Sequence, residues 1–109
     1  MNTNEFLSRY AVGQRDFREV NLIAANLINV NLSGANLSLA DLRGAKMSST
    51  NLTKANLSGA NLSGANLSGA NFSKANLAMT NLTNASLSDI NLSGANLSGA
   101  TMPDGTTHN

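Results

Sequence analysis

A large apolar residue occupies every fifth position of this chain from Phe17 to Met102, without exception. This period suits no helix, because five steps of about 100° leave successive residues on different sides of the helix axis. It suits no straight strand either, since an odd spacing places successive residues on opposite faces. Only a chain that turns a corner every five residues keeps all of them inside. The predicted core centres are Phe17, Leu22, Leu27, Leu32, Leu37, Leu42, Met47, Leu52, Leu57, Leu62, Leu67, Phe72, Leu77, Leu82, Leu87, Leu92, Leu97 and Met102.

The remaining positions of the repeat fit such a corner. The residue two before each centre is most often Ala, which would point inward beside the centre, and the residue between them is Asn or Asp in fifteen of eighteen repeats. After the centre come mostly Ser or Thr and then, at seven positions, Gly, which favours turns. Four right-angle corners close a square, so twenty residues would form one coil. The sequence therefore predicts an all-β solenoid, a right-handed quadrilateral parallel β-helix of about four and a half coils.

The repeats also carry a family resemblance. Residues 55–59, 60–64 and 65–69 each read ANLSG, and eight repeats have Ala, then Asn or Asp, then Leu in that order. This pattern resembles the pentapeptide-repeat family, whose consensus is A(D/N)LXX. The resemblance covers residues 15–102 and implies the family's right-handed quadrilateral β-helix. The flanking segments around Tyr10 and Pro103 are similar to those of short cyanobacterial members.

We expect three segments: an N-terminal helical cap at residues 1–14, the repeat body at residues 15–102 and a tail at residues 103–109. Thr3 or Asn4 is expected to cap a short helix that ends at Gly13 and covers the first coil. The tail either folds over the last coil or leaves that end to a partner, so a monomer and an end-to-end dimer through the C-terminal coil both stay open. The predicted apolar face of the helix comprises Phe6, Leu7, Tyr10 and Ala11.

Charge and cysteine content exclude several classes of protein. The net charge is +1, charged residues make up 12% of the chain, and acids and bases are mixed, so neither a nucleic-acid footprint nor an acidic imitation of one is present. The absence of cysteine excludes disulfides and thiolate metal sites and fits a reducing compartment. The N-terminal segment contains Glu5 and lacks the apolar run of a signal peptide or a membrane span. We therefore expect a cytoplasmic protein that does not enter a membrane.

The sequence offers no catalytic constellation. His108 is the only histidine, and it falls in a tail that we expect to be frayed and that offers no second ligand or base. Glycines recur as corners and never as a phosphate-binding loop before a helix. We therefore expect a non-enzymatic protein with no metal and no cofactor. The aspartates, which fall in different positions of the repeat, are Asp16, Asp41, Asp89 and Asp104.

Three other functions are weighed on the surface residues. The resemblance implies, as an alternative, inhibition of a topoisomerase (gyrase) by imitation of duplex DNA, but residues 21–102 hold two acids against four bases. Nucleic-acid binding through Lys54 and Lys74 lacks the aromatic side chains that stack on bases. Serines at coil spacing, such as Ser38 and Ser58, would suit ice binding, but turn formation already explains them.

The interpretation that remains is a structural or protein-interaction module whose rigid side docks another protein. Its support is the departure from the repeat at outward corner positions. Leu39 and Met79 are expected to share one column with Gly59 between them, which would form a shallow apolar stripe. Lys54 and Lys74 should stack at another corner. The biological role and the identity of the partner are not specified by these residues.

Overall fold

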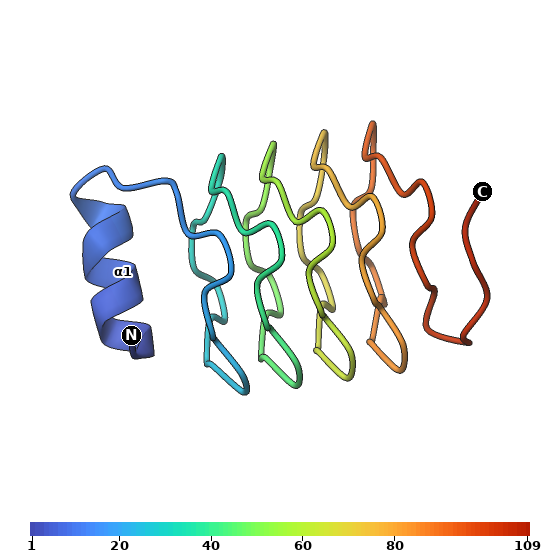
Figure 1. The fold of residues 1–109 in the computed structure, drawn as a ribbon, viewed down its shortest axis with the longest axis horizontal. Coiled ribbons are helices and arrows are strands. Elements are labelled where there is room, and N and C mark those ends of the chain that lie inside the picture. Colours follow the sequence, from blue (N-terminus) through green and yellow to red (C-terminus); the bar gives the residue numbers. More distant parts are fainter.

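The chain winds into a rod of stacked turns with one helix at its N-terminal end (Figure 1). The computed structural model describes residues 1–109, and its principal extents are 37 × 24 × 24 Å. Parallel bridges join residues twenty apart in four columns, from the pair Asp16 and Asn36 to the pair Asn81 and Thr101. Each side of a turn contributes one bridged residue, so the expected strands are isolated bridges separated by corners. The two equal transverse extents agree with a four-sided cross-section.

Hydrogen bonds between successive turns run the whole length of the rod. The N–H of Leu62 donates to the carbonyl of Asn81 in the following turn at 2.7 Å, and the N–H of Asn61 donates to the carbonyl of Ala40 in the preceding turn at 2.9 Å. The same two bonds recur from repeat to repeat. Each turn is therefore held by its two neighbours and by no residue further along the chain.

Each corner is a tight turn that follows a core centre. The N–H of Ala65 donates to the carbonyl of Leu62 at 3.0 Å, and Gly64 between them has φ +69°. A positive φ at the third residue of the turn is the mark of type II geometry and explains the preference for glycine there. The N–H of Ser63 donates to Oδ1 of Asn61 at 3.0 Å. Every Asn and Asp at this position of the repeat accepts the equivalent bond.

The core is a single column of apolar side chains inside the rod. The fourteen centres from Phe17 to Leu82 are buried, together with most of the alanines that lie two residues before them. Two threonines at the small inward position are also buried, and their hydroxyls donate to the carbonyls of Leu27 and Leu77. The last four centres pack against the core but are only half-buried, because no turn follows them: Leu87, Leu92, Leu97 and Met102.

Helix α1 (Thr3–Ala11) covers the first turn of the rod. Its N-cap is Asn2, whose Oδ1 accepts the N–H of Glu5 at 2.8 Å, so the expectation of Thr3 or Asn4 as the cap is wrong by one or two residues. Phe6 is fully buried, and its ring meets that of Phe17 edge to face at a centroid distance of 4.6 Å. The helix therefore closes the interior with an aromatic side chain.

The remaining face of α1 is more exposed than its sequence pattern predicts. Leu7 and Tyr10 are half-buried against the core, whereas Ala11 is exposed and does not belong to the packed face. Val12 is the C-cap, and Gly13 follows it with φ +106°, which agrees with the predicted end of the helix.

The C-terminal tail is paired with the rod. Thr107 forms an antiparallel bridge with Thr101, and the N–H of His108 donates to the carbonyl of Ala100 at 2.8 Å. The expectation of a frayed tail around His108 is therefore wrong for its backbone, because these bonds fix it, although the side chain is exposed. No helix of the structure has the length and apolar content that crossing a membrane requires.

Candidate interaction surface

The outward corners carry the side chains that do not serve the core. The third residue of each corner has a positive φ, and ten of these residues are not glycine. Leu39, Lys54, Lys74 and Met79 have φ between 59° and 62°. This left-handed conformation costs a residue with a Cβ atom about 1–2 kcal/mol, whereas glycine adopts it freely. These four positions therefore hold large side chains where the backbone favours glycine.

Leu39 and Met79 lie in one column, two turns apart, with Gly59 between them and Gly99 after them. Their exposed fractions are 60% and 68%. A Cβ atom at Gly59 would lie 2.8 Å from Cδ2 of Leu39, and a Cβ atom at Gly99 would collide with Sδ of Met79. Each large side chain thus lies over the glycine of the following turn. The predicted shallow apolar stripe runs along this column.

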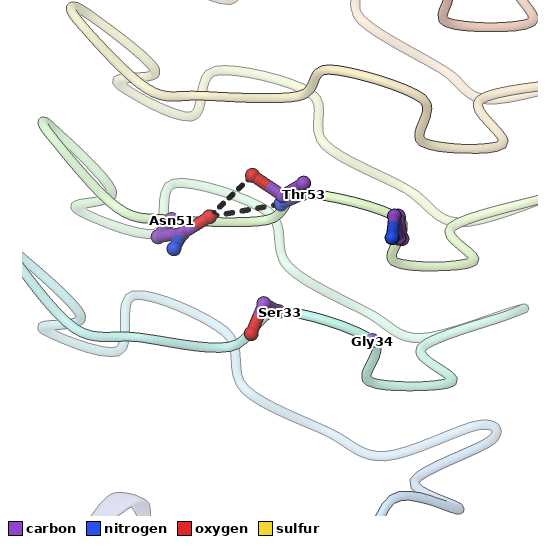
Figure 2. Close-up of a pocket in the computed structure, with 5 residues that line it drawn as sticks. Ser33, Gly34, Asn51 and Thr53 are labelled. Carbon is purple, nitrogen blue, oxygen red and sulfur yellow. Dashed lines mark hydrogen bonds between the residues drawn. The ribbon is translucent and has the colours of Figure 1, made fainter.

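Lys54 and Lys74 lie in consecutive turns of a second column, and neither has an ion-pair partner. Lys54 borders a shallow pocket of about 370 Å³ together with Ser33, Gly34, Asn51 and Thr53 (Figure 2). The hydroxyl of Thr53 donates to Oδ1 of Asn51 at 2.7 Å, and its N–H donates to the same atom at 3.0 Å. The free donors at the pocket therefore include the Asn51 amide and the Lys54 ammonium, whereas the Thr53 hydroxyl has used its hydrogen and can only accept.

The two columns border one side of the rod. This side, here called the Asn36 face, has the outward residues Asn36, Asn56, Asn76 and Asn96, which are joined by parallel bridges. The corner with the two lysines precedes the face along the chain, and the corner with Leu39 and Met79 follows it. The structure therefore brings all four predicted surface residues to the borders of one face.

An ion pair lies at the N-terminal end of this face. The carboxylate of Asp16 accepts hydrogen bonds from the Arg18 guanidinium at 3.0 and 3.1 Å, which lowers the pKa of Asp16. Both residues line a pocket of about 510 Å³ together with Glu19 and Leu39. The apolar stripe thus begins beside a group of charged side chains.

A second ion pair joins Asp41 and Arg43 on the next side of the rod. The guanidinium of Arg43 donates to the two oxygens of Asp41 at 2.9 and 2.7 Å. These bonds lower the pKa of the Asp41 carboxyl below its ordinary value.

The Asp41 pair predicts a dependence of stability on pH. A carboxyl whose pKa is lowered by folding stabilises the protein above its unfolded pKa of about 3.9, and this contribution is lost as the pH falls through the folded value. Asp41→Asn should therefore reduce the loss of stability between neutral pH and about pH 3. At neutral pH it should change the unfolding free energy by less than about 1 kcal/mol, because the pair is exposed and Asn is the usual residue of this position.

Thermal melts of both proteins at neutral and acid pH measure this difference. Arg43→Ser should act in the same direction, since it removes the group that lowers the pKa. Equal acid sensitivity in the parent and in both variants would contradict the assignment.

The structure assembles no reactive cluster from the other polar residues. The side chain of His108 is exposed in the tail, and the four aspartates lie apart from one another. No group of three or more His, Cys, Asp or Glu residues lies close enough together to hold a metal ion. Sequence reasoning missed the pocket residues Ser33 and Asn51, and it missed that the two corner columns flank one face. The two columns are offset by five residues in the sequence, which is one side of a turn. This offset is the signal that would have shown that they flank one face.

These repeats define a family. The model of the family described as pentapeptide repeats matches the chain in eight copies over residues 16–53, 50–89 and 80–104. The chain belongs to the pentapeptide-repeat family. No curated protein sequence matches it.

Solved structures of pentapeptide-repeat proteins resemble this one. A protein from the thylakoid lumen of Arabidopsis thaliana is 30% identical, with a TM-score of 0.66 over 91% of this chain and 73% of that one. A protein from Nostoc is 42% identical, with a TM-score of 0.53 over 92% and 79% of the two chains. The quinolone-resistance protein QnrB1 is 20% identical, with a TM-score of 0.33 over 75% and 50%, a likeness that carries no conclusion. Together with the family match, the Arabidopsis and Nostoc structures make the rod a right-handed β-helix solenoid.

Proposed function

We propose that this protein is a non-catalytic interaction module that docks another protein on its Asn36 face. The observation that carries this proposal is that Leu39, Met79, Lys54 and Lys74 all border that face in a backbone conformation that favours glycine. Large exposed apolar side chains and unpaired lysines contribute nothing to the core. Departures of this kind from local backbone preference are expected at functional sites.

The residues along the two borders indicate which chemical groups the partner carries where it contacts them. Lys54 and Lys74 favour acidic groups, and the stripe of Leu39 and Met79 favours an apolar side chain. Between them the Nδ2 groups of the asparagines can donate hydrogen bonds to the partner, while Oδ1 of each accepts one backbone N–H and keeps a second lone pair. The partner would thus carry acidic and apolar residues along opposite edges of one contact surface.

Glycine substitutions separate docking from stability. Leu39→Gly with Met79→Gly should weaken retention of the partner at least about ten-fold, because each removes a desolvated apolar contact of about 1–2 kcal/mol. The same change should leave the unfolding free energy unchanged or raise it by up to about 1 kcal/mol, since glycine relieves the left-handed backbone. Quantitative pull-down from the source organism and thermal melts measure the two effects.

Matched controls lie on the other corners of the rod. Ser49→Gly and Asn84→Gly relieve the same backbone conformation at exposed positions away from the Asn36 face, and they should leave partner retention intact. If the Leu39 and Met79 variants retain every partner of the parent protein, or if the controls lose the same partners, the Asn36 face is not the docking surface.

We propose the same three segments for the architecture: a cap at residues 1–14, a body at residues 15–102 and a tail at residues 103–109. Eighteen repeats in four columns support a body of about four and a half coils. Electron density for the rod would test the number of coils.

The alternative function, gyrase inhibition by imitation of DNA, gains no support from the surface. Along residues 21–102 the acids are Asp41 and Asp89, and the first of these is paired with Arg43. A surface that imitates phosphates needs dense unpaired negative charge.

We further propose that the protein works in the cytoplasm, either as a monomer or as an end-to-end dimer. Fluorescent tagging tests the compartment, which matters because the Arabidopsis relative comes from the thylakoid lumen. Native mass in solution tests the oligomeric state.

A further inference from the structure

The two ends of the rod differ in how their apolar interior is covered. At the N-terminal end, α1 covers the first turn, and Phe17 and the three centres that follow it are buried. Two backbone carbonyls at this end are also paired with side chains. The hydroxyl of Tyr10 donates to the carbonyl of Ser33 at 2.7 Å, and Nε2 of Gln14 donates to the carbonyl of Asp16 at 2.9 Å. The apolar interior is therefore covered at this end, although three backbone N–H groups of the first turn have no partner, those of Asn21, Asn26 and Asn31.

The C-terminal end lacks such a cover on three of its four sides. Leu87, Leu92 and Leu97 are half-buried, although the centres of earlier turns are closed. Five backbone N–H groups and three carbonyls that would bond a following turn have no partner. The N–H groups belong to Leu87, Asp89, Leu92, Gly94 and Leu97, and the carbonyls belong to Ala85, Ile90 and Ala95.

The fourth side shows how such an edge is filled. The N–H of Met102 donates to the carbonyl of Thr106 at 2.7 Å, and the carbonyl of Ala100 accepts the N–H of His108 at 2.8 Å. These two bonds flank Thr101 and hold the tail antiparallel to the last turn (Figure 1). The edge therefore accepts an antiparallel strand.

The open sides present the same pair of groups. The carbonyl of Ala85 and the N–H of Leu87 flank Ser86 just as the bonded groups of Ala100 and Met102 flank Thr101. The pairs around Asn91 and Asn96 repeat this arrangement. We propose that the open C-terminal end binds an extended segment of a partner polypeptide, which adds as an antiparallel strand to one of these three sides.

Side-chain alternation defines the chemistry of that segment. In an extended chain, neighbouring residues point to opposite sides, so the residues on either side of the bridged one lie over the interior of the rod. In the tail these residues are Thr106 and His108, which are polar and exposed, so Met102 beside them is only half-buried although Ala100 is buried. The partner segment would carry apolar residues at these two places. It would be neutral, because Asp89 is the only charged residue in the last turn.

A second copy of this chain fits the end less well. The tail adds one strand beyond the last turn on one side only (Figure 1). Two rods placed end to end meet through their tails, so all three open sides cannot come within hydrogen-bonding distance at once. An extended segment meets no such obstacle.

Amide hydrogen exchange on the full chain tests the proposal. The probe is a blocked pentapeptide of alternating valine and threonine with threonine at its centre. Without it, the five unpaired N–H groups should exchange at nearly unfolded rates, whereas those of Leu67 and Phe72 should be protected. At about three times its dissociation constant, the peptide should slow exchange at the paired N–H groups by about four-fold.

Two controls isolate strand pairing from other binding. The same peptide with proline after its central residue lacks the N–H that corresponds to that of His108, and it should have no effect. Leu92→Gln should reduce the effect of the valine peptide, whereas Ser93→Gln, exposed on the outside of the same turn, should not.

Three results would overturn the proposal. They are equal slowing of exchange by both peptides, no change at any of the five N–H groups with the valine peptide, and protection that depends on protein concentration alone. The last result would make a second copy the occupant of the end. None of these results bears on docking at the Asn36 face, because the measured groups lie at the end of the rod.

Discussion

Leu62→Lys should abolish the folded rod. Leu62 is fully buried in the middle of the interior, surrounded by apolar side chains on both neighbouring turns. A lysine there would bury an unpaired charge or force the turn open, a change in the class that costs more than about 4–5 kcal/mol. Circular dichroism and gel filtration should show an unfolded or aggregated chain.

Two controls distinguish the buried charge from the mere loss of leucine. Leu62→Met should cost less than about 1.5 kcal/mol, since Met47 already occupies an equivalent position with no exposure. Leu97→Lys should be tolerated far better, because this half-buried centre at the open end lets the ammonium reach water. A Leu62→Lys protein that melts within a few degrees of the parent would refute the packed interior.

Phe6→Ala should detach the helix from the rod. Phe6 is fully buried and packs on Phe17, so its truncation should lower the free energy of opening of α1 and the first turn by about 3–5 kcal/mol. The effect should stay local, because turns bond only to their neighbours. Amide exchange should therefore accelerate in α1 and at Phe17, while the groups of Leu67 and Phe72 keep their protection.

Val12→Ala is the matched control within the cap. Val12 is 86% exposed, and its truncation should change stability by less than about 0.5 kcal/mol. If Phe6→Ala accelerates exchange uniformly along the rod, the rod unfolds as one unit and the nearest-neighbour description is wrong.

The body of the fold was predictable because one period controls every residue in it. A spacing of five from Phe17 to Met102 allows few ways to keep all centres inside, and the asparagine position fixes the direction of the side chain between them. The pairing of Asn36 with Asn56 follows from the closure of a square after twenty residues. Local chemistry and global packing agree at each of these positions.

The ends and the surface were less predictable because the five-residue period of the core centres does not determine their residues. Asn2, Thr3 and Asn4 are all good N-caps, and the helix that packs Phe6 on Phe17 is capped by Asn2. The bridge between Thr107 and Thr101 depends on a turn outside the repeat. The Asn36 face was not predicted because it is defined by two corner columns together. One column lies on each border of the side that carries Asn36, and this becomes clear only when the positions of both columns around the rod are compared.

The twenty-residue spacing of the bridges makes this chain sensitive to the size of an insertion as well as to its content. One extra pentapeptide between Leu39 and Met79 would leave every centre inside and every corner intact, yet it would rotate all later residues by a quarter turn about the rod axis. Met79 would then leave the column of Leu39, and Lys74 would separate from Lys54 if the insertion fell between them. Only the gain or loss of four repeats together changes the length of the rod and preserves which residues share a side.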